Sequence, residues 1–256
     1  MYQQPNAPQS IGGVLDSGFK MYRESLSQAY LLAAIAALVT APVNLFQSYF
    51  IANGVTGLIG TRGLLVIAAA LLAVVFYAAL IARIDAVARG APLSLGQALS
   101  LGLQRMGTMV LSGLLTIIVV AIGLCLLIIP GFIFMIWLVF APFAVVLERR
   151  GPLESLSYSH SIVRGHWWRT AVLLTIIGIV LMVVYMIFAV GISIAVISDP
   201  VAAAAGQVPW YVTLILGPVL SALILPLTYA LMLAIFYDLR LRYEGGDLAA
   251  RIAATA

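Results

Sequence analysis

A chain of 256 residues with 64% hydrophobic and 9% charged residues, and a mean hydropathy of +1.14, carries more apolar surface than a soluble core can bury. This composition excludes a soluble globular domain and predicts a membrane protein. The formal net charge of +4 would suit a nucleic-acid-binding protein, but the basic residues lie at the ends of apolar segments, so no nucleic-acid partner is expected.

Six stretches of the chain lack charged residues and are long enough, or nearly so, to cross a bilayer as a helix of about 20 residues. They are Tyr30–Phe50, Leu64–Ala82, Met109–Ile129, Phe132–Leu147, Ala171–Ser198 and Val201–Tyr237. We therefore predict an all-α polytopic membrane protein with six transmembrane helices. They form a single membrane domain over residues 10–248, between a disordered N-terminal tail (1–9) and a C-terminal tail (249–256).

Three polar segments that lead into the first, third and fifth spans have the apolar spacing of amphipathic helices. Ser10 is a candidate N-cap of the first, and Ser94 forms a capping box with Gln97 at the start of the second. Gly151-Pro152 places proline at the first helical position of the third. We predict three hairpins, each preceded by a cytoplasmic interfacial helix. Both a threefold duplication and the general tendency of short membrane loops to form such helices explain the pattern.

Prolines mark the turns and breaks within the apolar segments. Pro130-Gly131 alone separates the third and fourth spans, which predicts a tight hairpin. Four further prolines interrupt the first, fourth and sixth spans: Pro42, Pro142, Pro218 and Pro226. Transporters use such breaks as hinges or ion sites, but no ionisable residue lies near the centre of a span here, so static kinks are favoured.

The basic residues are strongly asymmetric along the chain. If the N-terminus is cytoplasmic and the six spans alternate in direction, only Arg62 of the 13 lysines and arginines lies outside. Cytoplasmic loops of membrane proteins carry such an excess of positive charge. We therefore expect both termini in the cytoplasm.

Two groups of polar residues are candidate sites. Asn44 and Gln47 lie one turn apart just after Pro42, where a small polar spot inside the first span is expected. The second group flanks the third amphipathic segment and is expected to meet anionic lipid headgroups of the inner leaflet: Arg149, Arg150, Arg164, Trp167, Trp168 and Arg169. The alternative role of these residues is to orient and anchor the chain only.

The sequence contains no pattern that indicates an enzyme. His160 and His166 are six residues apart, which does not match the spacing of metal ligands on one helix. No span pairs a serine with a histidine, and the only cysteine, Cys125, allows no intrachain disulfide. We expect no catalytic residue, no bound metal and no cofactor.

Several motifs occur in an order that is found in a known family. They are Ile129-Pro130-Gly131-Phe132, Phe140-Ala141-Pro142-Phe143, Val145-Val146-Leu147-Glu148, Gly151-Pro152-Leu153-Glu154-Ser155-Leu156 and Ser161-Ile162-Val163-Arg164-Gly165-His166-Trp167-Trp168. This order resembles the core of the bacterial membrane-domain family named after glycerophosphoryl diester phosphodiesterase, and it is similar to the YciC-type uncharacterised bacterial membrane proteins. The opening Ile11–Arg23 and the C-terminal Tyr237–Leu248 resemble the two ends of that domain.

The resemblance implies a multi-pass protein of the bacterial cytoplasmic (inner) membrane that is associated with phospholipids or the envelope. The leading interpretation is a non-enzymatic protein of envelope or phospholipid homeostasis that acts through lipid or protein partners. The alternative is a channel or transporter for a small or amphipathic solute, which the kinked spans and the Asn44/Gln47 pair would serve. The expected partners are the bilayer and its anionic lipids, and a membrane-protein partner or a homo-oligomer remains open.

Overall fold

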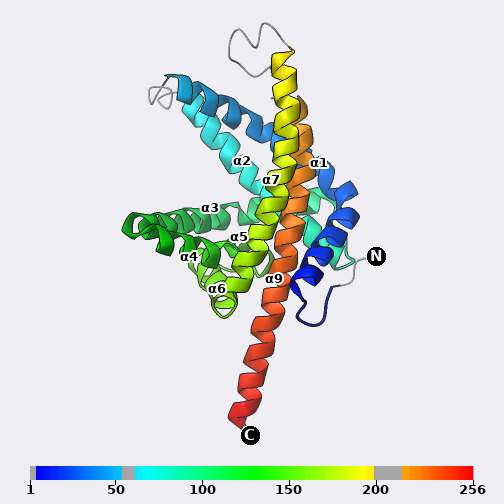
Figure 1. Cartoon of the computed structure of the whole chain (residues 1–256), viewed down its shortest axis with the longest axis vertical. Coiled ribbons are helices and arrows are strands. Elements are labelled where there is room, and N and C mark those ends of the chain that lie inside the picture. Colours follow the sequence, from blue (N-terminus) through cyan, green and yellow to red (C-terminus); the bar gives the residue numbers. More distant parts are fainter. Residues whose placement is uncertain (1–3, 54–60, 199–214, 256) are drawn as a thin grey trace.

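The computed structural model describes residues 4–53, 61–198 and 215–255, and within these ranges the side chains of 41–53, 61–62, 195–196 and 246–255 are not described. All the regular elements in these ranges are helices (Figure 1). They are α1 (Ile11–Asn53), α2 (Thr61–Ala88), α3 (Leu95–Leu126), α4 (Ile128–Leu138), α5 (Ala141–Leu147), α6 (Pro152–Arg164), α7 (Trp167–Ile197) and α9 (Gly217–Thr255). The all-helical prediction is confirmed for this part of the chain.

Five segments of the described residues are long and apolar enough to cross a bilayer. They are Gly63–Ala88, Leu95–Leu126, Ile128–Leu147, Trp167–Ile194 and Gly217–Gly245, and they overlap the second to sixth predicted spans. The first predicted span, Tyr30–Phe50, lies within α1. The fold is therefore compatible with a multi-pass helical membrane protein.

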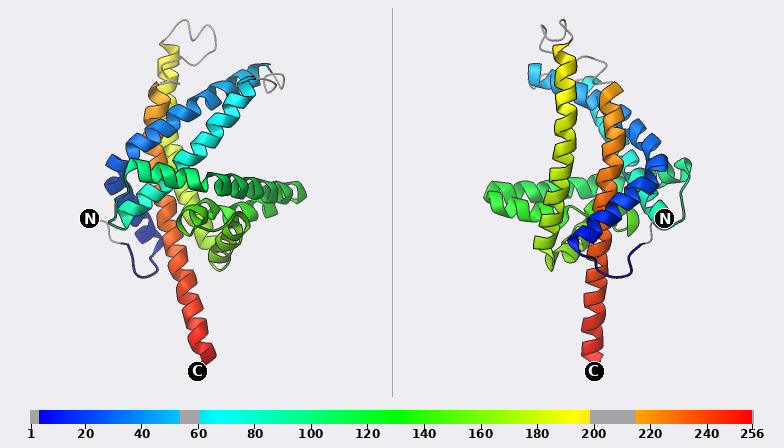
Figure 2. Two further views of the ribbon diagram at one scale, coloured as in Figure 1. Left: turned by 180° about the vertical axis from the view of Figure 1, so that it is seen from behind. Right: turned by 45° about the vertical axis from the view of Figure 1, so that its right-hand side comes forward.

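The helices are arranged in two directions. Helices α7 and α9 extend along the long axis of the molecule, and α1 and α2 form a tilted pair beside them (Figure 1). Helices α3 and α4 form a hairpin that projects sideways from this group in each view (Figure 2). The end of α1, the start of α2 and the end of α7 lie toward one end of the molecule, whereas α6 and the C-terminus lie toward the other.

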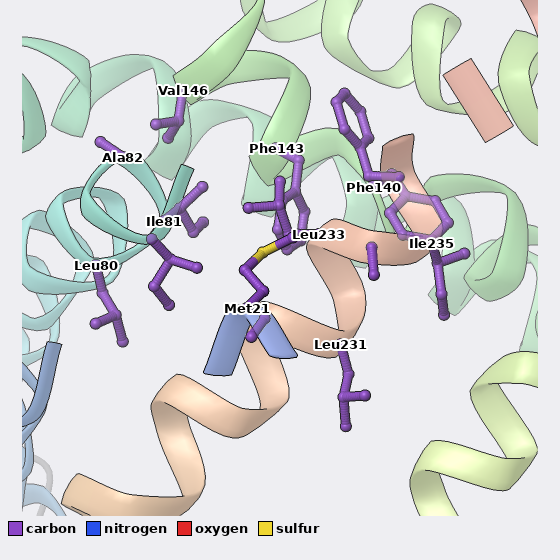
Figure 3. Packing of buried hydrophobic residues seen from close by; sticks show 14 of the residues in the cluster. Met21, Leu80, Ile81, Ala82, Phe140, Phe143, Val146, Leu231, Leu233 and Ile235 are labelled. Atoms are coloured by element: carbon purple, nitrogen blue, oxygen red, sulfur yellow. The ribbon is translucent and has the colours of Figure 1, made fainter. Parts of the chain in front are cut away.

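The hydrophobic core lies where α1, α2, α5 and α9 meet (Figure 3). Helix α5 has only seven residues, and five of them are buried. Its Phe143 stacks on Phe236 of α9 with ring centroids 5.9 Å apart, and Phe140 lies 6.2 Å from the same ring. This packing of large apolar and aromatic side chains fixes the short α5 segment between the long helices.

Glycine permits the closest helix crossing in the core. A Cβ atom at Gly102 of α3 would lie 2.3 Å from the backbone carbonyl oxygen of Val75 in α2. That distance is far below any van der Waals contact, so the α2–α3 crossing depends on the absence of a side chain at this position.

The predicted interfacial helices differ from the structure in one respect. The capping box of Ser94 and Gln97 is present at the start of α3. Helices α1 and α3, however, continue without a break from the amphipathic segment into the apolar one. Only α6 is separate, with Pro152 in its first turn and the Glu154 carboxylate accepting the Gly151 N–H at 3.1 Å. The periodicity predicts each helix, but the polar-to-apolar change does not mark a boundary.

The turn between the third and fourth predicted spans is also displaced. The chain leaves the helical conformation at Leu127 (φ −161°, ψ 148°), whereas Pro130 and Gly131 lie in the first turn of α4. Proline is accepted there because a first-turn residue needs no intrahelical N–H donor. A Cβ atom at Gly131 would lie 2.8 Å from the backbone nitrogen of Leu124, so this glycine allows α3 and α4 to meet closely.

Candidate functional site

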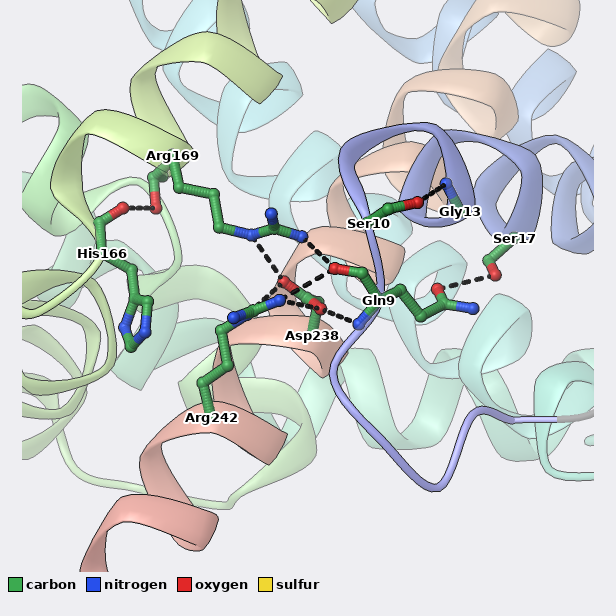
Figure 4. A network of polar contacts seen from close by, with 9 residues as sticks. Gln9, Ser10, Gly13, Ser17, His166, Arg169, Asp238 and Arg242 are labelled. Atoms are coloured by element: carbon green, nitrogen blue, oxygen red, sulfur yellow. Dashed lines mark hydrogen bonds and ion pairs between the residues drawn. The ribbon is translucent and has the colours of Figure 1, made fainter.

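The most buried charge cluster surrounds Asp238 near the middle of α9 (Figure 4). Only 1% of its side chain is exposed, and its Oδ2 accepts from Nε of Arg169 at 3.0 Å and Nε of Arg242 at 2.9 Å. Its Oδ1 accepts the backbone N–H of Gln9 at 2.8 Å. The carboxylate thereby joins α7, α9 and the segment that precedes α1.

The Gln9 peptide completes this cluster. Its carbonyl oxygen accepts from Nη2 of Arg169 at 2.6 Å and from Nη2 of Arg242 at 2.8 Å. Its side-chain oxygen accepts from the Ser17 hydroxyl at 2.9 Å. Gln9 is therefore part of the folded bundle, although the sequence places it in the tail. At the other end, α9 continues through most of the predicted C-terminal tail, to Thr255.

His166 lies next to this cluster at the start of α7 (Figure 4). Burial lowers the pKa of its imidazole, the positive charges of Arg242 and Arg169 lower it further, and the Asp238 carboxylate offsets only part of the effect. His166 is therefore neutral at pH 7, so the two guanidiniums and the carboxylate set the local charge.

A second network extends from the same stretch of α9. The Tyr237 hydroxyl donates to the Asp85 carboxylate of α2, which also accepts from Nε of Arg89 at 3.0 Å. Arg240 donates from Nη1 to Glu148 at the end of α5, at 2.8 Å. Tyr237, Asp238 and Arg240 thus connect α9 to α2, α5, α7 and the N-terminal segment.

The structure separates the six predicted headgroup residues. Arg169 binds Asp238, and the Arg150 guanidinium lies 4.1 Å from the centre of the Tyr158 ring. Burial, and to a lesser extent Glu148, raises the pKa of Tyr158 to about 12, so this ring stays a neutral phenol beneath the cation. Arg149 and Arg164 are exposed.

The other candidate residues fall in two places. Trp167 and Trp168 line an apolar groove, with their ring centroids 4.7 Å apart. Asn44 and Gln47 lie outside the residues whose side chains the structure describes.

Helix α6 is held by two buried serines, one of which, Ser159, binds a break in the preceding helix. The chain is not α-helical between Leu138, where α4 ends, and Ala141, where α5 begins. Pro142 lies in the first turn of α5. The Ser159 hydroxyl donates to the Trp137 carbonyl at 2.7 Å and accepts the Phe140 N–H at 3.2 Å. One turn earlier, the hydroxyl of Ser155 lies 2.8 Å from that of Ser112 in α3. The Ser159 hydroxyl thus pairs polar groups that the break leaves without helical partners, and the Ser155–Ser112 pair joins α6 to α3.

We expect Ser159→Ala to lower the free energy of unfolding by about 2 kcal/mol, because it leaves the buried Phe140 N–H and Trp137 carbonyl unpaired. Denaturant unfolding in detergent micelles measures this change. Ser161→Ala is the matched control, since its hydroxyl donates to the Tyr158 carbonyl within the same helix and the expected change is below about 0.5 kcal/mol. Equal effects of the two substitutions would contradict the role of Ser159.

An apolar groove lies between α4 and the start of α7. It has a volume of about 460 Å³ and is lined by Ile129, Phe132, Ile133, Trp137, Trp167 and Trp168. The indole N–H groups of Trp137 and Trp167 are buried and have no hydrogen-bond partner among the residues that the structure describes. We call this feature the tryptophan groove. The sequence indicates Trp167 and Trp168 but not Trp137, which lies 30 residues earlier within an apolar span.

Long apolar helices and buried charge networks near one end of the bundle are features of a multi-pass helical membrane protein. A family model described as a domain of unknown function (DUF7847) matches residues 28–239, and the chain belongs to this family. Neither the curated proteins nor the solved structures include a match to the chain.

Proposed function

We propose that this protein is a non-enzymatic integral protein of the bacterial cytoplasmic membrane that acts in phospholipid or envelope homeostasis by binding a membrane lipid. The tryptophan groove carries the proposal. Its volume falls within the range of about 300–1,000 Å³ that is typical of small-molecule sites, and such sites combine apolar walls with a few polar groups. The resemblance to the glycerophosphoryl diester phosphodiesterase membrane-domain family supports the link to phospholipids.

The two unpaired indole N–H groups indicate the chemistry of the ligand. A buried donor without a partner costs about 1–3 kcal/mol, and an acceptor oxygen on the ligand recovers this cost. The groove is lined by residues of two candidate spans, so it faces the hydrocarbon phase. An acyl chain along α4 satisfies both requirements if its ester oxygens reach the buried N–H groups of Trp137 and Trp167, which requires neighbouring side chains to move aside when the lipid binds.

The proposed placement has six spans arranged as three hairpins, both termini in the cytoplasm and the amphipathic segments at the inner leaflet. The α3–α4 hairpin projects sideways from α7 and α9 (Figure 2), so this placement requires it to turn toward their direction in the bilayer. The placement is supported by the five candidate spans of the described residues and by the positive-inside rule, since a cytoplasmic N-terminus and six alternating spans would leave 12 of the 13 basic residues in the cytoplasm. The aromatic packing of Phe140, Phe143 and Phe236 fills the core between the helices, which favours lipid binding at the periphery over conduction through the bundle.

We expect cysteines introduced at Asn53 and Gln207 to react with an impermeant thiol reagent in intact cells, and a cysteine at Gly246 to react only after lysis. Cys125 is first replaced by serine so that each variant carries one thiol. Mass spectrometry of the labelled protein measures the result. Labelling of the Gly246→Cys variant alone in intact cells would contradict the proposed orientation.

The groove itself is tested by removing the two indole donors while keeping aromatic rings in place. Trp137→Phe combined with Trp167→Phe is expected to lower the affinity for phospholipid by about 30-fold, and the amount of copurified phospholipid with it, because two hydrogen bonds of about 1 kcal/mol each are lost. Native mass spectrometry of the purified protein measures the bound lipid. Trp168→Phe is the control, because its side chain lies in the same groove but is 78% exposed. An unchanged lipid content in the double variant would contradict the proposal.

A further inference from the structure

The Gln9 carbonyl oxygen lies between two guanidinium groups. Nη2 of Arg169 and Nη2 of Arg242 donate to this one oxygen at 2.6 and 2.8 Å (Figure 4). Each guanidinium presents a planar fork of N–H donors, with Nε on the Asp238 carboxylate and Nη2 on this oxygen, and such forks match the oxygens of phosphate as well as carboxylate. A peptide carbonyl is a neutral acceptor, whereas an anionic oxygen at the same position adds a direct charge–charge attraction to both guanidiniums. An anionic oxygen is therefore a better acceptor at this position than the Gln9 carbonyl oxygen that occupies it.

The charge of the cluster fits one further anion. Asp238 neutralises one of the two guanidiniums and is itself held by both, with 1% of its side chain exposed. The two arginine side chains are 19% and 22% exposed, so they are shielded from salt but reachable from solvent. One positive charge remains in the cluster, and it matches the single negative charge of a phosphodiester.

The hydrogen bonds of the segment that covers this position are concentrated at its last residue, Gln9. Residues 4–9, which we call the N-terminal strap, precede α1, carry no charged residue and lie outside regular structure. Asn6, Ala7 and Pro8 are exposed, whereas Gln9 makes the hydrogen bonds to Asp238 and the arginines. Segments with few buried contacts open at low free-energy cost. The strap is thus able to leave while α7 and α9 stay joined through Asp238.

We propose that Arg169 and Arg242 form a phosphate-binding site, which the N-terminal strap closes by placing the Gln9 carbonyl where a phosphate oxygen binds. A phospholipid headgroup and a free phosphate share this chemistry. The proposal rests on the membrane placement proposed above and is independent of the tryptophan groove. Binding of phosphate releases the strap, and the free strap then exposes the chain N-terminal to α1.

Amide hydrogen exchange of residues 4–9 tests the proposal in the full-length protein. The protein is held in alkyl maltoside micelles, which contain no phosphate, and is titrated with a short-chain phosphatidylglycerol. We expect exchange in the strap to accelerate by about tenfold at saturation, because the ligand competes with Gln9 for both arginines. A diacylglycerol with the same chains is expected to have no effect. Unchanged exchange with phosphatidylglycerol would overturn the proposal.

Inorganic phosphate separates the two sources of the anion. Acceleration by phosphatidylglycerol alone supports a lipid headgroup site, and equal acceleration by inorganic phosphate supports a site for free phosphate. The double substitution Trp137→Phe and Trp167→Phe is expected to leave either response unchanged. An unchanged lipid content in this double variant together with a retained strap response therefore counts against the proposed function alone.

Two variants test the arginine fork directly. Arg169→Lys with Arg242→Lys keeps both charges but removes the fork, and the exchange response should disappear, whereas the exposed Arg164→Lys should respond as wild type. Loss of the response in the lysine variant could also result from misfolding. A second variant therefore keeps both arginines and lacks residues 2–9. It should bind phosphatidylglycerol about tenfold more tightly, since the competing carbonyl is gone. An unchanged or weaker affinity would overturn the proposal.

Discussion

Replacing Asp238 by alanine is expected to lower the free energy of unfolding by about 3 kcal/mol. The substitution leaves Arg169 and Arg242 largely buried without their anionic partner, and it removes the acceptor of the Gln9 N–H. The expected loss lies at the lower end of the range for breaking a buried ion pair, which is about 3–5 kcal/mol. The reason is that about a fifth of each arginine side chain is exposed to solvent. Denaturant unfolding of the purified protein in detergent micelles measures the change.

Asp16→Ala is the matched control. Asp16 also pairs with a basic residue four positions away, Lys20, at 2.6 Å, but both side chains are 61% exposed. Exposed ion pairs contribute only about 0–1 kcal/mol. If the two aspartate substitutions destabilise the protein equally, the Asp238 cluster does not hold the helices together as described.

The substitution Gly102→Ala is expected to be destabilising by about 2–3 kcal/mol, because the new methyl group would overlap the Val75 carbonyl of α2. The clash is with backbone, so a side-chain rotation cannot relieve it, and α2 and α3 have to separate along their crossing. The melting temperature of the protein in micelles and its yield after size-exclusion chromatography measure this effect.

Gly107→Ala provides the comparison on the same helix. A Cβ atom at Gly107 has no neighbour within 4 Å, so the substitution adds only helix propensity and is expected to stabilise α3 by up to about 1 kcal/mol. A loss of stability for Gly102→Ala and a gain for Gly107→Ala would support the close crossing of α2 and α3. A stabilising Gly102→Ala would show that α2 and α3 do not approach each other as the structure has it.

Local signals in the sequence predict much of the fold. The capping box at Ser94 and Gln97, the proline in the first turn of α6 and the apolar lengths of the spans all predict helices that the structure contains. The helix boundaries are less well predicted. Pro130 suggests a turn where the chain is already helical, because proline is compatible with the first turn of a helix as well as with a loop.

The charge networks depend on contacts between residues far apart in the chain, which no local pattern reveals. Gln9 and Asp238 are 229 positions apart, and Arg169 reaches both of them. The sequence indicates Arg169 as an interfacial cation, since its neighbours are two tryptophans. One usable signal was present: Asp238 and Arg242 have the four-residue spacing of an ion pair on a helix.

The tryptophan groove shows the same limit. Trp137 lies in an uninterrupted apolar stretch and gives no polar signal, so only the folded arrangement of α4 and α7 brings its indole close to Trp167. The break between α4 and α5, bridged by Ser159, sets the direction of α4 and hence the groove. Pro142 predicts an interruption in the span 132–147, but it does not indicate the direction that α4 takes or the groove beside it.

Photocrosslinking with a phospholipid that carries a diazirine near its ester groups tests lipid binding in the groove most directly. The full-length protein is irradiated in membranes, digested and mapped by mass spectrometry. We expect the crosslinks to concentrate on Phe132, Ile133, Trp137 and Trp167, and to decrease when Ile133→Trp fills the groove. Crosslinks spread evenly over the exposed apolar faces of α3 and α7, with no enrichment in the groove, would contradict lipid binding at this site.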